Sequence, residues 1–165
     1  MNKDECSMSD KISNGIGKGF ANEFNPQFNM RIELFDKSGN IKEVRNVHNT
    51  VTAAGKAGIM DQILSTPSLA KVGWMEVGTG TPAATLLGSY ITGSRVALTS
   101  KTRNANVVTM VGTFGAGVGT GAITEAGLFD VVTQNTVNMW CSASFAVVNK
   151  GASDSLVITW TLTAN

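Results

Sequence analysis

The sequence predicts a mainly β protein: an antiparallel β-sandwich of the jelly-roll kind with one short α-helix and an extended N-terminal arm. Three observations lead to this class. Apolar and polar residues alternate in about eight segments, turn-forming residues recur at intervals of about 8–12 residues, and a single capped helical pattern interrupts the series. We expect an arm over residues 1–26 and one β-sandwich domain over residues 27–165.

The body should begin with a β-hairpin. From Phe28, apolar and polar residues alternate over 28–34, as in a strand with one buried face. The segment DKSGN at 36–40 is rich in turn formers, and 41–49 resumes the strand pattern. These features predict two antiparallel strands at the start of the domain.

One helix is expected near residues 53–65. Thr52 precedes it as a candidate N-cap, and Pro67 follows it. Gly55 and Gly58 lie inside this segment. The apolar residues that share one face at helical spacing are Ala53, Ala57, Met60 and Leu64.

The rest of the chain should be β structure joined by loops. A helical turn or loop is expected over 84–91. Further strands are predicted at 72–77, 94–102, 106–114, 122–130, 136–148 and 155–163. The last of these alternates most regularly and should lie in the body of a sheet.

Composition excludes several classes of protein. The chain has 165 residues, 42% of them hydrophobic, and a net charge of +1, so neither a disordered chain nor a nucleic-acid or membrane partner is expected. Residues 1–80 hold nine basic and nine acidic residues, whereas residues 81–165 hold four and three. A second half so poor in charge favours coverage by other copies or partners.

Cysteine usage and the N-terminus favour assembly in a reducing, cytosolic compartment. Cys6 and Cys141 have no metal-like spacing, and we expect reduced thiols. The start MNKDECSMSD lacks the apolar core of a signal peptide, and no segment reaches the roughly 20 apolar residues of a membrane span.

The N-terminal arm carries an apolar series at a spacing of four. Its members are Ile12, Ile16, Phe20 and Phe24. Glycines at 15, 17 and 19 interrupt the series and disfavour an isolated helix. The pattern fits an arm that docks its apolar residues on a neighbour, and it fits a flexible tail equally well.

Residues 115–129, GAGVGTGAITEAGLF, form the most unusual segment. Glycine occupies every second position at Gly115, Gly117, Gly119 and Gly121, which favours either a special loop shape or the close approach of another surface. The loop also satisfies the loose pattern GxGxxG/A. A dinucleotide site would need a helix next, and the following residues do not predict one, so no cofactor is expected.

No set of catalytic or metal-binding residues emerges. His48 is the only histidine, so a His-based metal cluster or catalytic triad lacks partners, and a structural hydrogen bond is expected for it. Asp61 and Glu76 are isolated carboxylates and should lie on solvated faces. We predict a protein without enzymatic activity and without a bound metal.

Glu125 is the charged residue whose environment matters most. It shares strand parity with Ile123 and Phe129, so it should be partly buried and must be paired or strongly hydrogen-bonded. Arg95 and Arg103 are the candidate partners in this half of the chain. We expect a structural ion pair, within one subunit or across to another.

Four segments together resemble a family of small virion proteins of tailed bacteriophages. They are VHNTVTAAGKAGIMDQIL at 47–64, VGWMEVGTGTPAAT at 72–85, GTGAITEAGLFD at 119–130 and FAVVNKGASDSLVITWTLT at 145–163. The resemblance covers most of the chain from about residue 44 onward. It implies a β-sandwich structural protein of the phage particle without enzymatic activity.

Within that family, the role we favour is a capsid decoration or cement protein. It would be a homotrimer on the outer surface of the virion, bound to the major capsid protein and stabilising its lattice. Phe20, Phe24 and Phe28 are the expected anchors of the arm, because large buried aromatics dominate interfaces. The glycine loop at 115–121 is the second expected contact.

Two alternatives remain open. A tail, neck or fibre component of the virion would use the same fold at another place in the particle. A carbohydrate-binding adhesin would be supported by an exposed Trp74 or Trp140 among Asn and Asp residues, although all three tryptophans, Trp160 included, lie in apolar strand segments that suit core packing.

Overall fold

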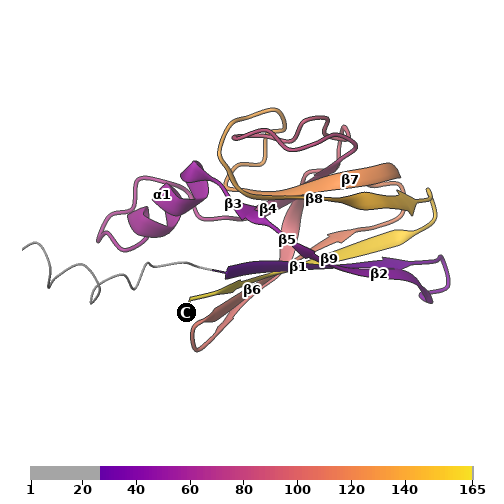
Figure 1. Cartoon of the computed structure of the whole chain (residues 1–165), viewed down its shortest axis with the longest axis horizontal. Coiled ribbons are helices and arrows are strands. Elements are labelled where there is room, and N and C mark those ends of the chain that lie inside the picture. The colour runs from indigo at the N-terminus through magenta and orange to yellow at the C-terminus, as the bar shows by residue number, and fades with distance from the viewer. Residues whose placement is uncertain (1–26, 165) are drawn as a thin grey trace, which may run out of the picture.

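The computed structural model describes residues 27–164, and in this part the chain forms nine antiparallel strands and one short helix (Figure 1). The elements are β1 Gln27–Phe35, β2 Ile41–His48, β3 Thr50–Val51, α1 Ala53–Asp61, β4 Trp74–Gly78, β5 Val96–Asn104, β6 Val107–Phe114, β7 Gly121–Phe129, β8 Met139–Lys150 and β9 Ser155–Thr163. The predicted class, a mainly β antiparallel fold with one short helix, is confirmed. The predicted arm at 1–26, with Phe20, Phe24 and Cys6, lies outside the described residues.

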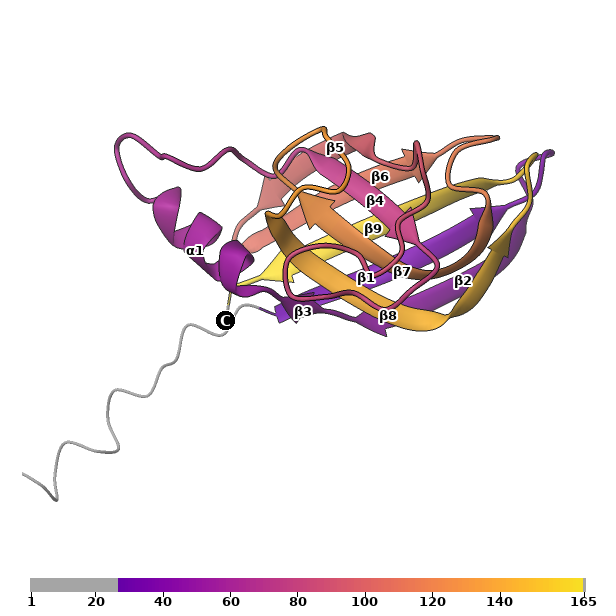
Figure 2. The same cartoon turned by 90° about the horizontal axis from the view of Figure 1, so that it is seen from above.

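The strands form two facing layers that β5 joins into one nearly closed, barrel-like sheet. Their order is β2-β1-β9-β6-β5-β4-β7-β8-β3. β5 pairs with β4 at Val96 and Ala97, and from Leu98 onward it pairs with β6. A register shift between Leu98 and Ser100 lies where the strand passes between the layers (Figure 2).

The sheet stays open between β2 and the second half of β8. Arg45 of β2 crosses this opening and donates to the carbonyl of Val147 at 3.0 Å, while its Nε is bonded to Glu43 on the same face of β2. Charged side chains at an open edge hinder pairing with a foreign strand. The ion pair between Arg45 and Glu43 should therefore hinder a foreign strand from pairing at this opening.

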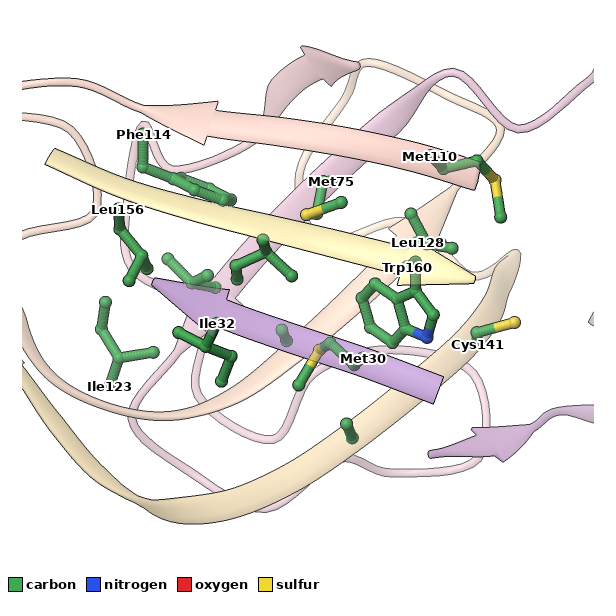
Figure 3. Packing of buried hydrophobic residues seen from close by; sticks show 14 of the residues in the cluster. Met30, Ile32, Met75, Met110, Phe114, Ile123, Leu128, Cys141, Leu156 and Trp160 are labelled. Carbon is green, nitrogen blue, oxygen red and sulfur yellow. The ribbon is translucent and has the colours of Figure 1, made fainter. Parts of the chain in front are cut away.

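The core lies between the two layers, and Figure 3 shows its packing. Phe28, Met30, Ile32 and Leu34 are buried on one face of β1, as the alternation predicts. β9 lies between β1 and β6 and buries Trp160 completely. The expectation that the last strand lies in the body of the sheet is confirmed.

The helix differs from its prediction in length and in its buried face. Thr52 is the N-cap, as expected, and its hydroxyl accepts from the Gly55 N–H at 3.0 Å. The helix ends at Asp61 rather than near 65, because the Asp61 carboxylate accepts N–H bonds from Ser68 and Leu69 and turns the chain. The buried residues are Gly55 and Gly58, whereas Ala53, Ala57, Met60 and Leu64, predicted to share the apolar face, are exposed.

Both glycines let α1 lie directly against Trp140 of β8. A Cβ at Gly55 would overlap the Trp140 carbonyl oxygen, and one at Gly58 would overlap its ring. The Gly55→Ala variant should lose about 1–3 kcal/mol of unfolding free energy through overpacking, although alanine is the better helix former. Chemical denaturation measures this. The control is Gly115→Ala, where a Cβ meets nothing within 4 Å; an equal loss in both variants would contradict the explanation.

Candidate functional site

The glycine loop at 115–121 connects β6 to β7. Gly117, Gly119 and Gly121 have φ values of +78°, +61° and +144°, which a side chain would strain, while Gly115 has no such constraint. A Cβ at Gly119 would meet the Val77 side chain at 2.8 Å. The close approach at Gly119 is thus to the chain's own core. The predicted contact of this loop with another surface stays a prediction.

Lys150 holds the loop in place from the neighbouring turn. Its Nζ donates to the carbonyls of Gly115 at 2.9 Å and Asp154 at 2.7 Å, and its side chain is buried. Burial lowers the pKa of this ammonium group, and the nearby Asp154 opposes that shift. The Gly117 N–H also donates to Ala152. The residues that follow the loop form β7 and not a helix, so the loop lacks the geometry of a dinucleotide site.

Asp154, in the same turn, should make the stability of the fold depend on pH in the acid range. Hydrogen bonds from Lys42 at 2.7 Å and from the Gly151 N–H at 2.9 Å lower its pKa below the ordinary 3.8. A carboxyl with a lowered folded pKa stabilises the fold above its unfolded pKa, and that contribution is lost as pH falls through the folded pKa.

We therefore expect the Asp154→Asn variant to be less stable than the wild type at neutral pH, with the difference shrinking below pH 3.8. Urea unfolding at a series of pH values measures it. The Lys42→Met control removes the hydrogen bond that lowers the pKa of Asp154 most, so it should reproduce part of the effect. A stability difference that does not vary with pH would contradict the assignment.

Glu125 is fully buried and bonds to backbone N–H groups instead of an arginine. Its carboxylate accepts from Gly80 at 3.0 Å, Gly88 at 2.9 Å and Ser89 at 2.8 Å. The predicted ion pair with Arg95 or Arg103 is therefore wrong within this chain. Three converging backbone donors satisfy the charge that an arginine was expected to satisfy.

The Glu125 carboxylate fits here because residues close to it are glycines, which have no side chain to collide with it. A Cβ at Gly78 would overlap Glu125 Oε1, and one at Gly80 would meet the same oxygen at 3.0 Å. The Thr124 hydroxyl adds a bond to the Gly80 carbonyl at 2.8 Å. The sequence segments 72–85 and 119–130 therefore encode one structural unit, in which a strand carboxylate organises the loop after β4.

Arg95 pairs with Glu76, a partner that sequence reasoning placed on a solvated face. Arg95 Nη2 lies 2.7 Å from Glu76 Oε2, and both side chains are almost completely buried. The guanidinium also stacks over the Phe129 ring, 3.6 Å from its centroid. Arg103 instead lies exposed and donates to the carbonyl of Ala105. The prediction for Glu76 is wrong, because strand parity alone did not show that the loops after β4 and β7 cover that face.

This ion pair connects the two covering loops. Arg95 donates to the carbonyls of Val131 and Thr133, and the Gln134 amide donates both to Glu76 and to the Ile91 carbonyl. Gln134 in turn accepts from the Gly93 N–H at 2.8 Å. These bonds connect Glu76 and Arg95 with the loop after β4 and the loop after β7, so the network holds the two loops together.

The remaining candidates for chemistry stand apart from one another. His48 is exposed at the end of β2, and Asp61 binds the turn after α1. Within residues 27–164, no three His, Cys, Asp or Glu side chains are grouped so as to hold a metal ion. Burial raises the pKa of the Cys141 thiol, which keeps it protonated.

An apolar groove opens at the end of the barrel that carries α1. It has a volume of about 260 Å³ and is bordered by α1, β1, β5, β6, β7, β8 and β9. Phe28 of β1, Ile59 of α1 and Leu162 of β9 belong to its wall. Beside it, four large apolar side chains are exposed: Met60, Ile63, Leu64 and Leu69. We call these four residues the apolar patch.

Phe28 is the one predicted aromatic anchor within the described residues, and it contributes to this groove while being only 7% exposed. Sequence reasoning missed the patch, since Met60 and Leu64 were assigned to the core face of a longer helix. Residues 27–164 contain no helix with the length and apolar character that crossing a bilayer requires. No protein-family model, curated protein or solved structure matches the chain.

Proposed function

We propose that this chain is a structural protein of a tailed-bacteriophage virion and that it decorates the capsid. The observation that carries the proposal is the apolar patch beside the groove. Met60 is 48% exposed, Ile63 76% and Leu64 58%, all at one end of the body. Large exposed apolar side chains that gather in one short segment, here residues 60–64, mark a surface that another protein covers.

The hydrogen bonding of the buried charged residues gives independent support for a structural role. Glu125, Glu76 and Arg95 spend their hydrogen-bonding capacity on loops of the same chain. A catalytic carboxylate must instead be free to exchange a proton with a substrate. These side chains therefore fit a rigid module that binds through its surface.

Such a module would act through many weak contacts. As a homotrimer it would bind several copies of the major capsid protein at once, so that each modest contact reinforces the others. The resemblance of segments 47–64, 72–85, 119–130 and 145–163 to small phage virion proteins agrees with this role.

A particle-binding assay tests the proposal. Purified protein is mixed with phage shells that lack it, and the bound fraction is measured after sedimentation. We expect saturable binding at a fixed ratio to the major capsid protein, together with increased resistance of the shells to heat. Protein that stays in the supernatant at every concentration would overturn the capsid role.

Deletion of residues 1–25 tests the arm in the same assay. The shortened chain should keep the folded body, because the described elements begin at Gln27. It should lose binding to the shell, because without Phe20 and Phe24 the copies no longer assemble into the multivalent unit whose weak contacts add up on the shell. Circular dichroism serves as the control for folding. Unchanged binding of the folded, shortened chain would exclude the arm as the anchor.

The alternatives predict different outcomes. A tail, neck or fibre component would be found at low copy number and would not bind shells. For an adhesin, the criterion was an exposed tryptophan among Asn and Asp residues; Trp140 is 8% exposed, and the half-buried Trp74 packs against Leu87, Phe129 and Met139. A glycan array tests that alternative directly.

A further inference from the structure

We propose that the groove beside α1 receives Phe20 and Phe24 from the N-terminal arm of a neighbouring copy, and that successive copies joined in this way close into a ring. This inference rests on the proposed function as an assembling virion protein and names the surface that makes the assembly. The occupant is thus a second copy of this chain, and the receptor is a feature of the described body.

The chemistry of the groove suits an aromatic side chain. Its wall combines Phe28, Ile59, Val108 and Leu162 with Trp140, so a phenyl ring would lie among apolar and aromatic groups. Lys71 and Lys101 border the same groove, and Lys101 Nζ donates to the Val72 carbonyl at 2.7 Å. In the arm, Glu23 stands between Phe20 and Phe24. The arm therefore offers two rings and one carboxylate to an apolar groove with two cations.

The apolar patch indicates that the donor is a second copy. Two phenylalanines filling the groove would leave Ile63 and Leu64 uncovered, whereas the body of a neighbour brought in by its arm can cover them.

The position of the groove allows a ring to close. The groove is bordered by α1, which lies at one end of the barrel (Figure 2). Phe28 lies in the groove wall and β1 begins one residue earlier at Gln27, so the first described residues of the body and the groove lie at the same end. In a cyclic arrangement of copies this end can face a common axis. Exchange of identical segments around such an axis satisfies every groove and leaves no free arm.

Complementation between two variants tests the exchange in the absence of particles. The first variant lacks residues 1–26 and keeps the groove. The second carries Val108→Glu, which places a charge in the groove wall and keeps the arm. We expect the full chain to be oligomeric by light scattering, each variant alone to be monomeric, and the two mixed to form a 1:1 complex. Val132→Glu is the matched control, since Val132 is 56% exposed on the loop after β7, and it should remain oligomeric.

A third variant covers the case in which Val108→Glu fails to fold. Phe20→Asp with Phe24→Asp changes only the arm and should weaken self-association by about a hundredfold, as loss of two anchor residues does. A labelled peptide of residues 16–26 should bind the chain lacking residues 1–26 saturably, and the peptide with both aspartates should not.

Three results would overturn the inference: a monomeric full chain, an oligomer that persists without the arm, or two folded variants that do not combine. Its failure is distinguishable from failure of the proposed function. Loss of arm exchange with shell binding retained refutes only the exchange, and an intact ring that binds no shell refutes only the capsid role.

Discussion

The Arg95→Met variant should lose about 3–5 kcal/mol of unfolding free energy, because it leaves Glu76 buried without its countercharge. Both side chains are at most 2% exposed, so solvent cannot replace the lost partner. The bonds from Arg95 to the loop after β7 disappear as well. Urea denaturation followed by tryptophan fluorescence measures the loss as a shift of the transition midpoint.

Arg103→Met is the matched control for this prediction. Arg103 is exposed and makes a local bond to Ala105, so its replacement should change stability by less than about 0.5 kcal/mol. The double variant Glu76→Met with Arg95→Met should be less destabilised than the sum of the single changes, since it removes both charges together. Equal stability of the Arg95 and Arg103 variants would show that the ion pair does not clamp the loops.

Glu125→Ala should cost about 3 kcal/mol or more, because three N–H groups lose a charged acceptor and each unsatisfied donor costs about 1 kcal/mol or more. The loss should concentrate in residues 79–89, which the carboxylate organises. Hydrogen exchange of the amides of Gly80, Gly88 and Ser89 measures it locally, and chemical denaturation measures it globally.

Two controls separate the role of charge from that of volume. Glu125→Gln keeps the size of the side chain but brings an NH₂ group toward the backbone donors. This variant should therefore be less stable than the wild type and more stable than Glu125→Ala. Glu33→Ala removes a carboxylate whose side chain is 22% exposed and paired with Arg31, and it should change stability little. Unchanged exchange at Gly88 and Ser89 in Glu125→Ala would refute the assignment.

The strands were predictable because alternation and burial agree in them. β1, β6 and β9 each present one face to the core, and their bounds differ from the expected ones by one residue at most. The expected strand at 41–49 corresponds to β2, Ile41–His48. The short strand β3, Thr50–Val51, was not predicted, because the chain changes layers after His48 and only two residues pair with β8.

The site was less predictable, because its interactions depend on loops with no periodic signal. Gly55 and Gly58 counted against a helix, yet they are its packing surface against Trp140. The partner of Glu125 was sought among arginines, since a nest of backbone donors is formed only when residues 78–89 fold around the carboxylate. The burial of Glu76 likewise arises from covering loops that alternation cannot reveal.

The copy number of this chain in purified virions tests the central claim most directly. Quantitative mass spectrometry of particles gives its ratio to the major capsid protein. A decorating module that clamps the shell should be present in hundreds of copies, in fixed proportion to that protein. A dozen copies or fewer would place it in the tail or neck, and its absence from the particle would contradict the whole account.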